Sequence, residues 1–366
     1  MIYRGAVYFV EATTDDVRLV LRLLHEGTNE YCYPLNYVEA TSLIKDYDEV
    51  VGVKIRDADG KEYEVKSSLV INATGVWADE LRHQVGEKPR MRPLRGSHMI
   101  FSRDRLPVNH AISFLHPIDG RPVFAYPWEG ATLVGTTDLD YQESLEKEPS
   151  ITPEEIDYLM LGLSYMFPDL NLKAHEAIST FAGVRPIISS GKADPSQELR
   201  DHAIWVEHGM MTVTGGKYTT FRIVAREALE KAESLLKNFK LKDAEEVPEN
   251  KEIDASFHRR IHGYYGNFAE TLLNDEIGTR MINGTEMLWI ELIWGARHEA
   301  VEHLSDLLLR RTRLGLLLPN GASEHFDRIK NICLKELNWN EERWEKEKEA
   351  YLKLIEKNYF VPKRSE

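Results

Sequence analysis

The segment MTVTGGKYTTFR, residues 211–222, constrains the fold of this chain more than any other stretch. Its β-branched residues indicate a strand that ends at Gly215-Gly216, and a helical pattern follows from Thr219. Two glycines before a helix start let a ligand approach free backbone N–H groups without a steric barrier. The spacing between the glycines and Lys217 does not match a P-loop. We therefore expect an α/β domain with a ligand site at this turn, unless the glycines only form a turn and leave Lys217 in solvent.

A second strand-to-helix junction lies in INATGVWADELR, residues 71–82. The short apolar run 69–71 predicts a buried strand that leads into a helix. Ala73 and Gly75 carry almost no side chain, so a flat or phosphate-bearing ligand could approach the backbone there. The alternative is a tight strand-to-helix turn that binds nothing.

Other local patterns predict the elements between and around these junctions. Thr14 is the expected cap of an N-terminal helix, Asp59-Gly60 the turn of a hairpin, and Thr152 the cap of a later helix. Regular turn signals predict an antiparallel sheet over about 95–140. Strands are also expected at 177–190 and 202–216, and a long helix at 219–239.

The composition changes at KLKDAEEVPENKEIDAS, residues 240–256, which is charged and has no apolar periodicity. A chain of 366 residues is long enough for two domains. We expect a mixed α/β domain at 1–240, a linker at 241–256, and a helical domain at 257–366.

Two side chains stand out within apolar, strand-like stretches. Arg185, in FAGVRP, must keep its charge paired or solvated, which indicates a bound carboxylate or phosphate, or else a salt bridge within the protein. His98, in RGSHMIF, lies beside small residues at the start of a strand, although a lone histidine more often has a structural role.

Charge and cysteine content exclude some classes of protein. A formal net charge of −14 disfavours unspecific nucleic-acid binding, because most of the surface repels a polyphosphate. Cys32 and Cys333 lack the spacing of a zinc site or a disulfide framework. No apolar run is long enough for a membrane span, and the N-terminus lacks the apolar core of a signal peptide. We expect a cytoplasmic chain with at most peripheral membrane contact and no metal.

Four segments, in this order and at these separations, resemble the FAD-dependent glycerol-3-phosphate dehydrogenases and the related alpha-glycerophosphate oxidases: INATGVWADELR, DGRPVFAYPWEGATLVGTTDLDY, STFAGVRPII and TVTGGKYTTFRIVAREALE. A fifth, ARHEAVEHLSDLLLRRTRLGLLL, resembles their C-terminal helical domain. The resemblance runs from about Gly5 to the end of the chain. It implies an α/β (α+β) flavin-oxidoreductase-like domain with a partial FAD-binding region and an antiparallel substrate-binding sheet, followed by an all-α C-terminal domain. The FAD-contacting parts would be about 1–95 and 181–237, and the substrate sheet about 95–180.

The sequence departs from this family at its start. Members begin with a Gly-rich G-x-G-x-x-G turn that seats the FAD pyrophosphate, whereas this chain begins at MIYRGAVYF, downstream of such a turn. We expect a fragment, a mis-assigned start, or one half of a split protein in which a separate chain supplies the missing segment.

The resemblance implies oxidation of sn-glycerol 3-phosphate to dihydroxyacetone phosphate, by hydride transfer from C2 to flavin N5 and onward transfer of electrons to quinone or oxygen. It assigns one group of residues to the adenosine side of FAD and a second group to the pyrimidine end of the flavin. The first group comprises Val38, in the expected strand LNYVEATSL, with Ala73, Thr74 and Gly75; the second comprises Gly215, Gly216, Lys217, Thr219 and Thr220. Trp77 is a further expected cofactor contact.

The same resemblance places His98, Arg185, Lys217 and Thr219 at the substrate. His98 is the candidate general base because the ordinary pKa of histidine is near neutrality, and Arg185 or water is the competing assignment. Arg185 offers a planar fork for a phosphate or an alkoxide, and Lys217 a point charge near both flavin and substrate.

The segment LLRRTRLG raises a separate question about binding. Arg310, Arg311 and Arg313 could bind an anion or a lipid headgroup, although pairing with local carboxylates is the commoner arrangement. A homodimer and a peripheral membrane location are compatible with the family.

Two other functions stay open. The chain could be a related flavin amine or hydroxy-acid oxidase, although the helical C-terminal domain disfavours it. It could also be a truncated, non-catalytic subunit that does not bind FAD alone.

Overall fold

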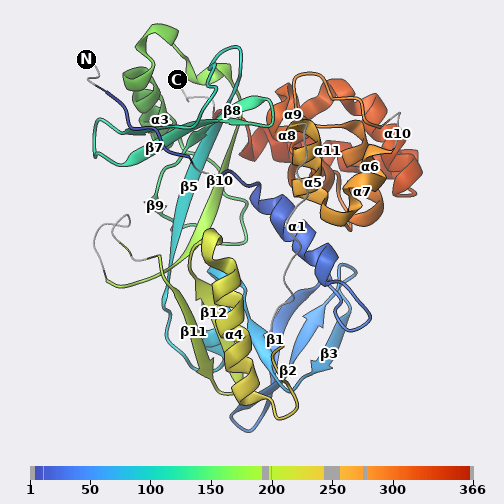
Figure 1. The fold of residues 1–366 in the computed structure, drawn as a ribbon. Coiled ribbons are helices and arrows are strands. Elements are labelled where there is room, and N and C mark those ends of the chain that lie inside the picture. Colours follow the sequence, from blue (N-terminus) through green and yellow to red (C-terminus); the bar gives the residue numbers. More distant parts are fainter. Residues whose placement is uncertain are drawn as a thin grey trace.

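The computed structural model describes residues 5–10, 12–191, 198, 200–242, 256–274 and 278–362 (Figure 1). Two long strands, β5 (Met91–Ser102) and β10 (Ala177–Ile188), run through the middle of the molecule. The C-terminal helices lie beside one end of these strands, and two small sheets lie toward the other end (Figure 1). None of the described helices is both long and apolar enough to cross a lipid bilayer.

The predicted antiparallel sheet is confirmed, and it begins slightly earlier than expected, with β5. Its order is β10-β5-β8-β7-β6, and β9 pairs with β5 off this path. The shorter strands are β6 (Ile112–Leu115), β7 (Pro122–Trp128), β8 (Ala131–Gly135) and β9 (Leu139–Asp140).

Helix α3 (Pro153–Met166) packs against this sheet. Thr152 caps it as predicted, in a reciprocal capping box with Glu155. Apolar residues of the helix and the sheet form a common buried core, which includes Met99, Phe101, Val134, Leu159 and Leu163.

A small three-stranded sheet brings the two glycine-containing junctions together. Its order is β11 (His202–Glu207), β12 (Met210–Gly215) and β4 (Val70–Asn72), and β12 runs parallel to β4. Because the carboxyl ends of parallel strands point the same way, the segments after β4 and β12 emerge at one edge. Helix α2 (Ala78–Gln84) follows the first and α4 (Phe221–Leu235) the second.

The predicted hairpin at Asp59-Gly60 is confirmed in the other small sheet. This sheet has the antiparallel order β1 (Glu39–Asp46), β2 (Glu49–Arg56) and β3 (Glu62–Lys66). Gly60 has a φ of 81°, a conformation that glycine adopts without strain.

Two predicted helix starts were wrong by one or two residues. Helix α1 (Asp16–Gly27) is capped by Asp15 rather than Thr14, because the Asp15 carboxylate accepts a hydrogen bond from the Arg18 N–H at 2.9 Å. Helix α4 begins at Phe221 rather than Thr219, since Thr220 bonds through its N–H and its hydroxyl to the Lys217 carbonyl and tightens the entry into a 3₁₀ turn.

The C-terminal unit is helical, as predicted. It contains α5 (Ser256–Tyr265), α6 (Ala269–Leu273), α7 (Trp289–His298), a π-helix η7 (Asp306–Arg311), α8 (Leu314–Leu317), α9 (Pro319–Ala322), α10 (Phe326–Glu336) and α11 (Glu341–Asn358). Most of the expected linker, 243–255, lies outside the described residues.

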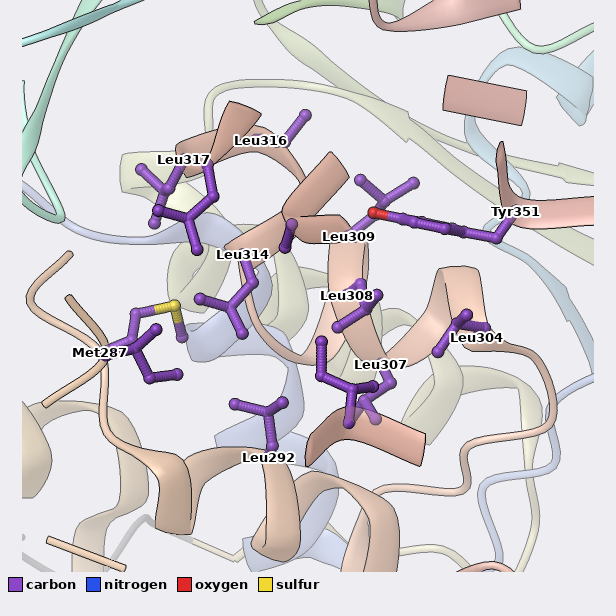
Figure 2. Packing of buried hydrophobic residues seen from close by; sticks show 14 of the residues in the cluster. Met287, Leu292, Leu304, Leu307, Leu308, Leu309, Leu314, Leu316, Leu317 and Tyr351 are labelled. Carbon is purple, nitrogen blue, oxygen red and sulfur yellow. The ribbon is translucent and has the colours of Figure 1, made fainter. Parts of the chain in front are cut away.

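A leucine-rich core holds this unit together and joins it to the sheet. Figure 2 shows leucines from η7 and α8 that converge with Met287, Leu292 and Tyr351. Ile100 and Leu133 of the sheet belong to the same core. The helical unit is therefore packed on the sheet over a continuous apolar interface.

Candidate functional site

The turn after β4 lines a cavity of about 620 Å³. Gly75 has a φ of 62°, and Asn72, which is 1% exposed, accepts hydrogen bonds from the N–H and hydroxyl of Thr74. Predicted cofactor residues Ala73, Thr74, Gly75 and Trp77 line the cavity together with Val76, Tyr141, Leu145, Lys147, Pro149, Val184 and Pro186. Sequence reasoning missed that Asn72 stabilises this turn, although asparagine is a known turn residue whose side chain bonds the backbone two residues on.

The turn after β12 requires both glycines. Gly215 and Gly216 have φ values of 74° and 81°. A Cβ at Gly215 would lie 2.5 Å from the Asp201 carbonyl oxygen, and the Gly216 N–H donates to that same oxygen at 2.9 Å. The turn leaves the side chains of Lys217 and Thr219 exposed.

His98 lies on β5 among close neighbours. Its ring stacks on Phe181 with a centroid distance of 4.7 Å and an interplanar angle of 10°. A Cβ at Gly135 would lie 2.2 Å from its Cδ2, so only a glycine fits opposite. The His98 Nδ1 is buried and has no hydrogen-bond partner among the described residues.

Burial, followed by the nearby charge of Arg185, lowers the pKa of His98 to about 3. The imidazole is therefore neutral at physiological pH. The sequence argument started from the ordinary pKa of histidine, which burial lowers in the folded chain. What the structure offers is a neutral imidazole with an unpartnered nitrogen.

The lowered pKa of His98 predicts a dependence of stability on pH. The unfolded chain takes up a proton on His98 as the pH falls below 6.5, whereas the folded chain does so only near pH 3. The free energy of unfolding is therefore unaffected by His98 above pH 6.5 and decreases as the pH falls from 6.5 toward 3. Within this window His98 should add a slope of up to about 1.4 kcal/mol per pH unit to the free energy of unfolding. Chemical denaturation of wild type and His98→Gln across this range measures it. A slope that is equal in the two proteins would contradict the burial of His98.

Arg185 lies across the neighbouring strand on the same face as His98. The pairing of β10 with β5 places Phe181 opposite His98 and Gly183 opposite Gly96, and alternate residues of a strand share one face. The guanidinium occupies the space above Gly96, where a Cβ would lie 2.2 Å from Nη2. Burial, in first place, lowers the pKa of Arg185 below its usual value.

Asp138 gathers three arginines at this position. Arg185 donates to its Oδ1 at 3.0 Å, while Arg121 and Arg200 lie 3.2 and 3.1 Å from its Oδ2. The Asp138 side chain is 1% exposed. Arg185 therefore has the protein carboxylate that was one of its two expected partners, but one carboxylate does not neutralise three guanidinium groups. The cluster is a positively charged site suited to an anion.

Sequence reasoning missed Arg121, Asp138 and Arg200. Arg121 and Asp138 occur in DGRPVFAYPWEGATLVGTTDLDY, where a charged residue beside a strand was the available signal. Their convergence depends on strand pairing and on a contact with a residue that follows β10, so local pattern could not reveal it.

The predicted residues form two groups on the two sides of β10. Val184 and Pro186 line the cavity near Gly75, and the side chain of Arg185 between them leaves the opposite face of the strand. Within the described part of the chain, no hydrogen bond or ion pair joins Lys217 to His98 or Arg185. Val38 directly precedes β1 rather than lying within the strand as expected.

The chain belongs to the FAD dependent oxidoreductase family, whose model matches residues 2–222. A second model, the C-terminal domain of alpha-glycerophosphate oxidase, matches residues 213–344. These matches confirm the predicted family, its FAD-dependent fold and the helical C-terminal domain.

Similar proteins share one name. The aerobic glycerol-3-phosphate dehydrogenase of Staphylococcus haemolyticus is 31% identical over 373 residues, which is 92% of this chain and 67% of that protein. Its namesake in Bacillus subtilis is 38% identical over 244 residues, 66% of this chain and 44% of that protein. A solved structure of the glycerol-3-phosphate dehydrogenase from Bacillus halodurans complexed with FAD has a TM-score of 0.72 and 26% identity, and the match covers 93% of this chain and 73% of that one. The chain thus spans only part of these relatives.

Proposed function

We propose that this chain provides the substrate-binding face and part of the FAD site of an enzyme that oxidises sn-glycerol 3-phosphate to dihydroxyacetone phosphate. The arginine cluster around Asp138 carries the proposal, because one carboxylate meets three guanidinium groups and one of these, Arg185, lies on the face that also holds His98. The names of the similar proteins support the same substrate.

The two glycine junctions fit FAD. Positive φ angles and missing side chains at Gly75, Gly215 and Gly216 allow close approach of a flat ring or a ribose, and a cavity of about 620 Å³ is open beside the first junction. Bound FAD supplies the acceptor for the hydride from C2. Val38, Ala73, Thr74, Gly75 and Trp77 would hold its adenosine side, and Gly215, Gly216, Lys217, Thr219 and Thr220 its flavin end.

The substrate phosphate fits the arginine cluster. Arg185 donates through Nη1 to Asp138 and through Nη2 to the Thr136 hydroxyl, and Nη2 keeps a second N–H for a ligand. Arg200, whose side chain is 44% exposed, has room to turn from Asp138 to a ligand. A phosphate would supply negative charge to balance the guanidinium groups that Asp138 alone does not neutralise. Lys217 and Thr219, exposed at the helix entry, would contact the substrate from the flavin side.

His98 would take the proton of the C2 hydroxyl. With its own proton on Nε2, the imidazole presents Nδ1 as an acceptor, and this nitrogen has no partner among the described residues. Burial is the larger cause of the low pKa of His98 and the charge of Arg185 is the second; a phosphate bound at Arg185 would offset the second cause and make the ring more basic.

Gly96→Ala tests the position of Arg185. The new Cβ should displace the guanidinium from Asp138 and weaken glycerol 3-phosphate binding about tenfold. The free energy of unfolding should change by about 1 kcal/mol or less, because the obstructed atoms are the flexible end of a side chain. Calorimetric titration measures the affinity. Gly27→Ala, with no atom within 4 Å of the added Cβ, is the control. Unchanged affinity in Gly96→Ala would remove Arg185 from the substrate site.

Two alternatives remain as outcomes of one assay. An arginine cluster also suits a carboxylate, as in an amine or hydroxy-acid oxidase, and the second alternative is a non-catalytic chain that does not bind FAD alone. Turnover of glycerol 3-phosphate, amino acids and 2-hydroxy acids with FAD and an artificial electron acceptor separates them. We expect turnover of glycerol 3-phosphate alone; activity only on the acids would reject the proposal, as would inactivity even after addition of the N-terminal segment of a relative.

The physiological setting follows from the same proposal. The electron acceptor is quinone or oxygen, the site is cytoplasmic or peripheral at the inner face of the cell membrane, and the chain forms a homodimer. The acidic surface fits a protein that does not bind nucleic acid.

A further inference from the structure

One stretch of the C-terminal unit, residues 306–313, reaches both ends of the proposed cofactor site. It consists of η7 followed by Thr312 and Arg313. A π-helix leaves the regular α-helical hydrogen-bond pattern and is frequent at functional sites. We call this stretch the 306–313 segment.

At the adenine end, the segment holds the residue directly before Val38. The Tyr37 hydroxyl donates to the Asp306 carboxylate, 2.7 Å from Oδ1 and 2.8 Å from Oδ2. Asp306 is 3% exposed, and the Tyr37 ring packs edge-on against His303 at 5.2 Å. Tyr37 has a φ of 55°, a left-handed conformation that a tyrosine keeps only when surrounding contacts enforce it.

A second contact secures the same loop. The Asn36 side-chain amide donates to the Ala300 carbonyl at 2.7 Å, and Arg311 donates to that carbonyl at 3.2 Å. The loop before β1 is therefore fixed by the C-terminal unit rather than by its own sheet.

At the flavin end, the segment acts through the start of α1. Arg313 Nη2 lies 3.3 Å from Asp15 Oδ1 and 3.0 Å from Asp16 Oδ1. The Asp16 carbonyl accepts the hydroxyl of Tyr218 at 2.5 Å. Tyr218 follows Lys217 in the 3₁₀ turn between the double glycine and α4.

Each series of contacts ends one residue from a proposed FAD contact: the first at Tyr37, next to Val38, and the second at Tyr218, next to Lys217. Neither Tyr37 nor Tyr218 belongs to a regular strand or α-helix, so the strand ladders and α-helices do not fix either residue. We infer that the 306–313 segment positions both ends of the FAD site, with Tyr37 and Asp306 fixing Val38, and Arg313, Asp16 and Tyr218 fixing Lys217. This inference rests on the proposed function, because it takes Val38 and Lys217 as cofactor contacts.

Hydrogen exchange of the cofactor-free chain tests the positioning contacts separately from activity. Tyr37→Phe should speed exchange of the amides of residues 37–40 about tenfold and leave 216–220 unchanged. Tyr218→Phe and Arg313→Gln should speed exchange of the amides of residues 216–220 about tenfold and leave 37–40 unchanged. Exchange equal to wild type in all three variants would overturn the inference.

Arg22→Gln is the matched control. Arg22 also joins α1 to the C-terminal unit, through the Gly263 carbonyl at 3.2 Å, but from the middle of the helix rather than from its start. It should leave both regions unchanged. Faster exchange at 216–220 in this variant would mean that any loosening of α1 has the same effect, which would reject the specific role of Arg313.

FAD titration, followed by flavin fluorescence, separates this inference from the proposed function. Each of the three variants should bind FAD about fivefold more weakly than wild type, while Tyr31→Phe, an exposed tyrosine, should bind equally. Equal FAD affinity in wild type and the three variants would overturn the positioning role. If the variants show the altered exchange but the wild-type chain takes up no FAD, even with the N-terminal segment of a relative, the proposed FAD site is rejected and the positioning contacts stand.

Discussion

Arg185→Gln is expected to raise the dissociation constant of glycerol 3-phosphate about 100-fold. The substitution removes the charged fork from the face shared with His98, and a charge-assisted hydrogen bond contributes about 1.5 to 3 kcal/mol. Arg121 and Arg200 keep their contacts with Asp138, so some attraction for phosphate should remain. Calorimetric titration with glycerol 3-phosphate and with glycerol measures how much of the loss depends on the phosphate.

Arg105→Gln controls for the loss of an arginine pair. Arg105 binds Glu176 through two nitrogens at 2.7 and 2.8 Å, outside the Asp138 cluster. It should leave the dissociation constant unchanged. An Arg185→Gln protein that binds glycerol 3-phosphate as tightly as wild type would refute the assignment of the phosphate to this cluster.

His98→Gln is expected to lower turnover of glycerol 3-phosphate by about 100-fold to 10,000-fold, the range for loss of a general base. Glutamine fills similar space but does not take up a proton. Because the phosphate is assigned to the arginines, the dissociation constant should change much less than the rate. Steady-state kinetics with an artificial acceptor, combined with calorimetric titration, separates the two effects.

A substrate deuterated at C2 sharpens this test. If His98 takes the hydroxyl proton, its loss should make chemistry limit turnover, and the deuterium effect on the rate should grow or stay large. Turnover within about threefold of wild type would assign the proton to Arg185 or to water, the competing candidates.

Local chemistry explains what could be predicted of the fold. Thr152 and Glu155 form a capping box over a single turn, and Asp59-Gly60 sets its hairpin by its own backbone angles. The same holds for the double glycine at 215–216, where the strand ends as expected. The cap at Asp15 was missed because Thr14 and Asp15 are both good N-cap residues, and only the geometry of the Arg18 N–H decides between them.

Long-range pairing explains what could not be predicted of the site. Asp138 meets arginines that lie before, within and after strands of one sheet, and no periodicity links these positions. The low pKa of His98 depends on its burial against Phe181 and on Arg185 of the neighbouring strand. Sequence pattern could identify His98 and Arg185 as candidates, but not their shared face.

The arginines of LLRRTRLG show the same limit. Arg313 pairs with Asp15 and Asp16, and Arg310 lies 3.5 Å from Glu148, so pairing with carboxylates of the protein describes both better than a free anion site. Pairing with carboxylates could be predicted as the commoner arrangement. Because these partners are far away in the sequence, their identity could not be predicted, nor could the contact that Arg313 makes between α1 and the C-terminal unit.

Anaerobic addition of glycerol 3-phosphate to the FAD-loaded chain tests the central claim most directly. The loading is done with the chain alone and with the N-terminal segment of a relative, and the flavin absorbance and the product are measured together. The proposed function predicts loss of the oxidised flavin band with one dihydroxyacetone phosphate formed per flavin, and no loss in Arg185→Gln at the same substrate concentration. An unchanged band with glycerol 3-phosphate, together with loss of the band on addition of an amino acid or a 2-hydroxy acid, would contradict it.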